Sequence, residues 1–202
     1  LNYADHVKEG GRPLPEHQIW FAKQTTCIVG PGAGIEIPVV SDKIDYEAEL
    51  CVVIGKRCRN VPRDRAMEVV AGYMCGNDVS VRDWQRHAQQ IASGKNFVGT
   101  GPFGPWLVTP DEIGDPTKLK LETRVNGAVV QSTNTSMLIF SIPRLIEYCS
   151  TIFDLVPGDV IATGTPAGVG FTRNPPVFLK PGDVVEVEIE NIGVLRNPVA
   201  DE

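Results

Sequence analysis

Short apolar runs, several of them preceded by turn residues, recur along the chain, and this pattern predicts strands. Residues 45–54, DYEAELCVVI, end in consecutive apolar side chains and predict one strand. Residues 159–163 and 183–189 each begin at a Pro-Gly-Asp turn and predict two more strands. All three segments are short, as expected for a chain built from small sheets.

A β-hairpin is predicted around the dipeptide Asn126-Gly127. Residues 120–125 and 128–132 flank it and have the composition of strands. Asn and Gly supply the two positive φ angles of a type I′ turn, which matches the twist of the strands that it joins.

Three or four short helices are expected in addition to the strands. Residues 63–71 are bounded by a proline and a glycine, which start and stop helices. A pattern that resembles a capping box predicts a helix from Ser80 through Ala92, and a serine and a proline predict another from Ser141 through about Ser150. These elements together predict an α+β fold, mainly β, in a single domain over residues 1–202.

Composition and charge narrow the possible functions. The 20 glycines and 16 prolines favour a loop-rich β fold, and 19 basic against 25 acidic residues (net charge −6) argue against a nucleic-acid surface. No apolar run reaches the length of a membrane span, and we expect no signal peptide. Five cysteines without a C-x-x-C pair favour reduced thiols and a cytoplasmic location. Because the chain begins at Leu1 within a polar, motif-like segment, we expect further residues upstream.

Several acidic residues are candidate metal ligands. Glu47 and Glu49 are separated by one residue, so on a strand both carboxylates face the same side. A hard divalent cation would compensate these like charges, although a solvated face of an edge strand has the same pattern. Asp78 lies at a predicted strand-to-helix junction, where it either serves function or caps a turn.

Other polar side chains are candidates for catalysis or substrate binding. His6 and Glu9 have the spacing of neighbours on one helical turn, so the carboxylate could orient the imidazole as a general base; a solvated surface histidine is the alternative. Lys95 lies in a loop next to a glycine. Arg82 and Gln85 would either bind a carboxylate or line a wet helix face.

Two glycine-rich segments do not indicate a nucleotide-binding enzyme. Residues 30–34 precede an extended stretch instead of the helix that a dinucleotide fingerprint requires. Residues 163–170, TGTPAGVG, lack the Gly-Lys-Ser/Thr ending of a P-loop, although their small residues allow close contact with a small anion.

Taken in order, five motifs resemble those of the fumarylacetoacetate hydrolase family. They are LNYADHVKE (1–9), the E-x-E of DYEAEL (45–50), NDVSVRDWQ (77–85), the lysine of GKNF (94–97) and TGTPAGVG (163–170). The resemblance covers essentially the whole chain. Lys23 matches a frequent family lysine, whereas Val98 stands where many members have an acidic residue.

The resemblance implies a mixed β-roll that is usually dimeric, with short peripheral helices and a bound Mg²⁺ or Mn²⁺ (Ca²⁺ being possible). It also implies three sets of site residues: the metal ligands Glu47, Glu49 and Asp78, the catalytic residues His6, Glu9 and Lys95, and the substrate contacts Arg82, Gln85 and Thr165.

The expected activity is hydrolysis of a C–C bond in a 2,4-dioxo acid such as an acylpyruvate, through a metal-stabilised enolate, with release of pyruvate. Decarboxylation or tautomerisation of an oxaloacetate-like acid, and hydration or isomerisation of a 2-oxo-alkenoate, use the same core and are the alternatives. We expect the protein to be a homodimer and to bind a small 2-oxo or 2,4-dioxo acid as its substrate. We expect no nucleic-acid or membrane partner. A non-enzymatic, metal-stabilised β domain is the competing class.

Overall fold

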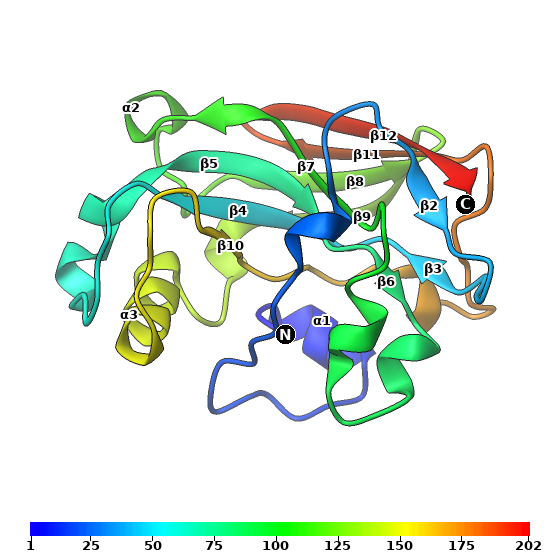
Figure 1. Ribbon diagram of the computed structural model, residues 1–202, viewed down its shortest axis with the longest axis horizontal. Coiled ribbons are helices and arrows are strands. Elements are labelled where there is room, and N and C mark those ends of the chain that lie inside the picture. The colour runs from blue at the N-terminus through cyan, green and yellow to red at the C-terminus, as the bar shows by residue number, and fades with distance from the viewer.

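The computed structural model describes residues 1–202 and contains two five-stranded sheets (Figure 1). The first sheet has the order β1 (Ile28–Val29), β7 (Gly101–Val108), β5 (Val70–Asn77), β4 (Ala48–Ile54) and β10 (Val160–Ala162). Its strands pair antiparallel except β1, which runs parallel to β7. Since β4 lies between β5 and β10, it is an interior strand.

The second sheet has the order β2 (Ile35–Ile37), β12 (Gly193–Asp201), β11 (Val184–Ile189), β8 (Lys120–Val125) and β9 (Ala128–Asn134). The predicted hairpin is confirmed: β8 and β9 pair antiparallel, and φ is 51° at Asn126 and 80° at Gly127. A third, two-stranded sheet joins β3 (Ile44–Asp45) to β6 (Ser80–Val81).

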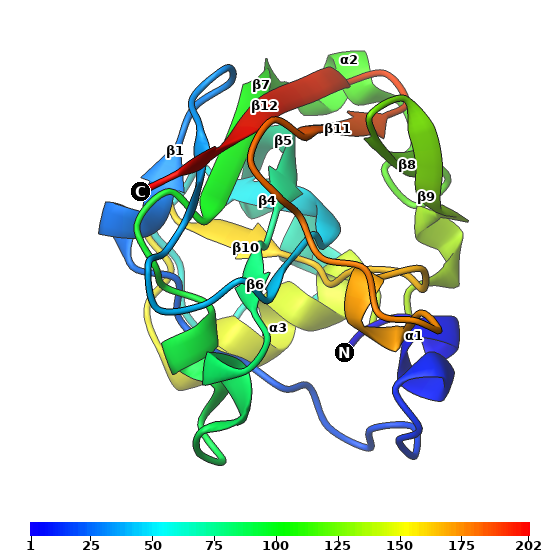
Figure 2. The same cartoon turned by 90° about the vertical axis from the view of Figure 1, so that its right-hand side faces the viewer.

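Three α-helices and six 3₁₀ turns surround the sheets. The helices are α1 (Ala4–Glu9), α2 (Pro110–Ile113) and α3 (Ile142–Ile152); the 3₁₀ turns are η1 (Thr25–Cys27), η2 (Arg63–Val69), η3 (Trp84–Arg86), η4 (Ile91–Gly94), η5 (Thr135–Met137) and η6 (Gly170–Thr172). The helix predicted after Ser141 is confirmed as α3, which packs against η2. The mainly β fold with short peripheral helices is likewise confirmed, and Figure 2 shows the sheets from a second side.

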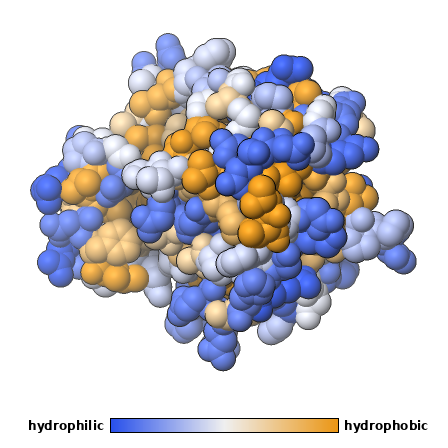
Figure 3. Space-filling view, turned by 45° about the vertical axis from the view of Figure 1, so that its right-hand side comes forward, coloured by the Kyte–Doolittle hydropathy of each residue, from blue (hydrophilic) through white to orange (hydrophobic).

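The hydrophobic core has two parts. The larger cluster of 24 residues includes Leu50, Val52 and Ile54 of β4 together with the apolar side of α3. The smaller cluster of 8 residues gathers around β3 and β6 and includes Tyr46. Apolar patches on the face in Figure 3 alternate with hydrophilic ones. None of the helices is long and apolar enough to cross a membrane.

Two predicted elements were wrong. Residues 45–54 do not form one strand, because Asp45 pairs with Ser80 in β3–β6 and β4 begins only at Ala48. The helix predicted from Ser80 through Ala92 does not form; Ser80 and Val81 are a strand, and only the short turns η3 and η4 follow. The Ser80 hydroxyl donates to the Asp78 carbonyl instead of capping a helix. Strand pairing with a distant segment thus outweighs the local capping pattern.

The element predicted over residues 63–71 is shorter than expected. It is the 3₁₀ turn η2 over Arg63–Val69, and Val70 already belongs to β5, where it pairs with Ile54. Pairing with β4 therefore ends the helical turn before the glycine at position 72.

Candidate metal and catalytic site

The three carboxylates predicted to bind metal converge at one end of the β4–β5 pair. Glu47 precedes β4, Glu49 lies within it, and Asp78 follows β5. Because β4 and β5 run antiparallel with Ala48 opposite Asn77, the start of one strand adjoins the end of the other. One oxygen atom from each carboxylate lies within 4.8 Å of the others. All three residues are buried, so the alternative of a solvated edge strand is wrong.

Hydrogen bonds of the backbone fix the two acidic segments to each other. The amide of Glu47 donates to the Asn77 side-chain oxygen at 2.9 Å, and the amide of Asp78 donates to the Glu47 carbonyl at 2.8 Å. The carboxylates are therefore held by the ends of regular strands, which position side chains more rigidly than free loops do.

Three cations pair with two of these carboxylates. Lys95 Nζ lies 2.6 Å from Glu47 Oε2 and 2.7 Å from Asp78 Oδ2. Lys23 Nζ lies 2.9 Å from Asp78 Oδ1, and an Arg82 nitrogen lies 2.7 Å from Glu47 Oε1. Burial alone would raise the pKa of Glu47, but the charges of Lys95 and Arg82 outweigh burial and lower this pKa.

Glu49 has no cationic partner. Its Oε2 accepts one hydrogen bond, from the Gly164 amide at 2.6 Å. Burial, together with the negative charges of Asp78 and Glu47, raises the pKa of Glu49 to about 8. A buried carboxylate without a counter-charge is costly, so this group is the uncompensated part of the cluster.

The donor set fits a hard divalent cation. Four buried carboxylates, the three above and Asp45, face only three cationic side chains. The negative charge of Glu49 is therefore left without a counter-charge from the protein. Closely spaced carboxylate oxygens are the ligands that Mg²⁺, Mn²⁺ and Ca²⁺ prefer, and a dication there would compensate Glu49.

Asp45, which the sequence analysis did not select, is linked through Arg82 to the carboxylates of Glu47, Glu49 and Asp78, here called the triad. Its carboxylate is completely buried and accepts hydrogen bonds from the amides of Gly170 at 2.7 Å and Phe171 at 3.0 Å. The Arg82 Nε donates to it at 2.8 Å while the same guanidinium contacts Glu47. Asp45, Glu47 and Glu49 alternate in DYEAEL, and this regular spacing of three acids was the signal that could have identified Asp45.

His6, which is buried, and Glu9, which is half-buried, form a hydrogen-bonded pair on α1. His6 Nδ1 lies 2.7 Å from Glu9 Oε1, and His6 is only 7% exposed. The predicted helical turn is confirmed, and His6 is not a solvated surface residue. Because Nδ1 is bonded to Glu9, the imidazole has Nε2 left to exchange a proton. His6 lies close enough to the triad to contribute to the lowered pKa of Glu47.

Glu9 also ties α1 to the loop after β10. Its Oε2 accepts hydrogen bonds from the Gly168 amide at 2.9 Å and from the Thr172 hydroxyl at 3.1 Å. Burial raises the pKa of Glu9, but the hydrogen bonds from His6, Gly168 and Thr172 outweigh it, so the net pKa is lowered. Glu9 therefore remains ionised and able to stabilise a protonated His6.

The predicted substrate contacts lie around the same site and are bound to protein groups. An Arg82 nitrogen donates to Gln85 Oε1 at 3.1 Å. Thr165 is buried, and its hydroxyl accepts a hydrogen bond from Gln131 Nε2 at 2.9 Å. Gln131, which the sequence reasoning also did not select, accepts from the Ala48 amide as well, and so links Thr165 to the start of β4.

Comparisons with known proteins agree with this arrangement. Residues 1–200 match the family model "Fumarylacetoacetate (FAA) hydrolase C-terminal". The chain is 49% identical over 201 residues to "Oxaloacetate tautomerase FAHD2A, mitochondrial" of Bos taurus, covering 98% of this chain and 64% of that protein. This chain thus spans somewhat less than two thirds of the bovine relative.

Two solved structures have the same fold along the whole chain. The "5-carboxymethyl-2-hydroxymuconate delta-isomerase from Mycobacterium smegmatis" is 44% identical with a TM-score of 0.88, over 100% of this chain and 76% of that one. The "Fumarylacetoacetate hydrolase (EaFAH)" from Exiguobacterium antarcticum is 41% identical with a TM-score of 0.90, over 100% and 73%. The chain belongs to the fumarylacetoacetate hydrolase family of enzymes.

Proposed function

We propose that this chain uses a divalent cation to form enolates of 2-oxo acids, and that its reaction is hydrolysis of a C–C bond in a 2,4-dioxo acid. The observation that carries this proposal is the hydrogen-bonded His6–Glu9 pair, in which His6 is buried, close to three converging carboxylates. A general base oriented by a carboxylate is the group that activation of water requires. The hydrolase among the structural relatives supports this assignment.

Glu47, Glu49 and Asp78 would hold Mg²⁺ or Mn²⁺. A divalent ion held there supplies a Lewis acid that polarises the 2-oxo carbonyl of the substrate. The Lys95 ammonium, which Glu47 and Asp78 position, adds a second positive charge for the oxygen that becomes negative. The site is buried, so this charge is weakly screened by water.

The proposed hydrolysis consumes one water molecule, and His6 carries the proton between the two steps. His6 Nε2 accepts a proton from water, and the resulting hydroxide forms a bond to the C4 carbonyl carbon. The C3–C4 bond then breaks, and its electron pair passes to the enolate of pyruvate. Protonated His6 returns the proton to C3, which yields pyruvate and a carboxylic acid.

Tautomerisation or isomerisation is the second candidate, and the relatives support it comparably. The bovine relative is named an oxaloacetate tautomerase, and the mycobacterial one is named an isomerase. In that reaction His6 would move a proton between the carbon next to the 2-oxo group and a second position, without attack by water. Decarboxylation and hydration start from the same enolate.

One assay panel separates these reactions. Acylpyruvates and oxaloacetate are incubated with the protein in Mg²⁺ or Mn²⁺, and pyruvate, CO₂ and the enol–keto ratio are measured in H₂¹⁸O. Hydrolysis predicts pyruvate together with ¹⁸O in the released acid, whereas faster enol–keto conversion with no bond cleavage would instead identify a tautomerase. Activity that is unchanged after removal of all divalent ions would contradict both candidates.

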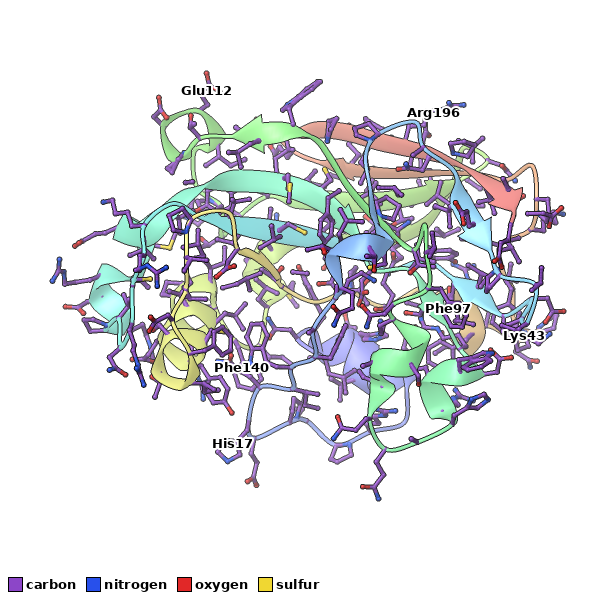
Figure 4. The ribbon with its side chains drawn as sticks, in the orientation of Figure 1. His17, Lys43, Phe97, Glu112, Phe140 and Arg196 are labelled. Carbon is purple, nitrogen blue, oxygen red and sulfur yellow. The ribbon has the colours of Figure 1, made fainter.

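A pair of histidine variants tests the role of the base. His6→Ala should lower hydrolysis by about 10²–10⁴-fold, the usual contribution of a general base. His17→Ala is the matched control because His17 is exposed on the loop after α1, as Figure 4 shows, and it should leave the rate unchanged. Equal rates in both variants would mean that another group activates water.

A further inference from the structure

Arg86, at the end of η3, is an exposed cation whose side chain pairs with no carboxylate. Its guanidinium carbon lies 5.2 Å from the centroid of the Phe171 ring. Stacking on an aromatic ring restrains an arginine while leaving its N–H groups free to donate in the plane of the guanidinium. Arg86 is thus positioned without being neutralised.

The same ring connects Arg86 to the candidate metal site. The Arg82 guanidinium carbon lies 4.3 Å from the Phe171 centroid, and an Arg82 nitrogen lies 2.7 Å from Glu47 Oε1. The amide of Phe171 is held by Asp45. Phe171 therefore lies against a buried cation that touches the triad and against an exposed cation that does not.

Arg86 and His6 belong to different elements of the fold, η3 and α1. Figure 2 shows α1 and the green turns of η3 and η4 below the sheets, on opposite sides of the view. Gln85, which precedes Arg86, bonds to Arg82, and the backbone of η3 packs closely against Gly94, the residue before Lys95. The exposed end of η3 thus lies beside the residues that surround the triad.

The charges of the cluster indicate what Arg86 would bind. Arg82, Lys95 and Lys23 are already paired with carboxylates of the chain. A 2-oxo acid bound through its carboxylate and 2-oxo oxygens would leave the far end of the molecule pointing away from the triad. A free guanidinium at that end matches a carboxylate, which it can bind through two parallel hydrogen bonds.

We propose that Arg86 binds the distal carboxylate of a dicarboxylic 2-oxo acid and so selects diacids over monoacids. This inference rests on the proposed function, because it assumes that the 2-oxo end binds at the triad. It assigns a specificity role to a residue outside the metal and proton-transfer groups. The Phe171 ring serves as the platform that holds the guanidinium.

A matched pair of ligands tests the inference. Binding of 2-oxohexanedioate and 2-oxohexanoate, which differ only in the distal carboxylate, is measured by calorimetry in Mg²⁺ with the natural chain and with Arg86→Gln. The natural chain should bind the diacid about tenfold more tightly, the size of a charge-assisted hydrogen bond near solvent. Arg86→Gln should bind both acids equally.

Arg144→Gln is the control variant. Arg144 is also exposed and stacks on a phenylalanine ring, that of Phe140 at 4.7 Å, but it belongs to α3. It should keep the preference for the diacid. A preference that survives in Arg86→Gln, or that is missing in the natural chain, would overturn the inference.

Oxalate separates this inference from the proposed function. It has no distal group, so the natural chain and Arg86→Gln should bind it equally and only with Mg²⁺ present. Equal oxalate binding also shows that the variant is folded. If oxalate binds but the diacid preference is absent, the inference about Arg86 alone is wrong. If the natural chain does not bind oxalate with Mg²⁺, the proposed function fails and the inference with it.

Discussion

Two clusters of charged residues in this protein use the same side-chain types in opposite environments. On the outer face of the second sheet, Arg124 contacts Glu188 at 2.6 Å and Glu186 at 3.4 Å, and all three side chains are at least 22% exposed. Arg196, at the upper edge in Figure 4, extends this surface group. In the candidate site, the side chains of Arg82 and its partners Asp45 and Glu47 are at most 7% exposed.

The difference lies in what happens when a partner is missing. Water screens the surface charges, so each exposed pair contributes little and each group tolerates loss of its neighbour. In the buried cluster, an unpartnered carboxylate cannot be solvated, and its pKa changes instead. Glu49 is in this position: burial and the charges of Asp78 and Glu47 raise its pKa to about 8. Four experiments test whether the buried and the exposed cluster differ in this way.

The largest effect should come from Glu49→Gln. Removing a candidate ligand should abolish Mg²⁺ binding and lower turnover by about a thousandfold or more, since metal-ion catalysis provides several kcal/mol. Calorimetry with Mg²⁺ and the pyruvate assay measure both quantities. Glu188→Gln, at the surface, is the control and should change neither. Retained Mg²⁺ affinity in Glu49→Gln would show that Glu49 is not a ligand.

Asp45→Asn should have an intermediate effect. The substitution keeps the shape of the side chain but removes the charge that holds Arg82, which in turn contacts Glu47. We expect Mg²⁺ affinity to fall about 10–100-fold, the usual effect of losing a group that orients a ligand. Amide hydrogen exchange at Gly170 and Phe171 should also become faster. Unchanged Mg²⁺ affinity despite faster exchange would limit Asp45 to a structural role.

The stability of the metal-free protein should fall as the pH rises. The pKa of Glu49 is about 8 in the folded chain, against an ordinary value of 4.5. Between these values the unfolded chain loses this proton while the folded chain keeps it, so stability decreases with pH and levels off above 8. We expect the Tm in EDTA to fall by about 10 °C between pH 5 and 8.5 relative to Glu49→Gln. Parallel Tm profiles for the two chains would contradict the raised pKa.

The smallest effect should come from Arg124→Gln at the surface. Loss of its exposed ion pairs should change the free energy of unfolding by less than about 1 kcal/mol. Turnover and Mg²⁺ affinity should stay at their original values because Arg124 belongs to the outer sheet face. Urea titration and the pyruvate assay measure these quantities. A loss of about 3 kcal/mol or more, the size expected when a buried ion pair loses one partner, would remove the distinction between the two clusters.

The sequence alone predicted the elements that depend on local conformation. Asn126-Gly127 selects its turn through the φ angles that these two residues adopt, and Ser141 and Pro143 start α3 through the conformation that they favour in the first helical turn. The motifs also named the triad and the His6–Glu9 pair. Both are determined by residue type and order, so no knowledge of the packing was needed to select them.

The roles of these residues depend on contacts between segments that are far apart in the sequence. Ser80 belongs to a strand because Asp45 lies opposite it, a contact across 35 positions that no local pattern contains. In the folded chain the Arg82 guanidinium donates to Asp45, whereas the Glu49 carboxylate accepts a hydrogen bond from a backbone amide and has no cationic partner. Burial and charge balance are properties of all the neighbours of a residue together. They arise only when distant segments meet, and for that reason the sequence selected the site residues but not their electrostatic roles.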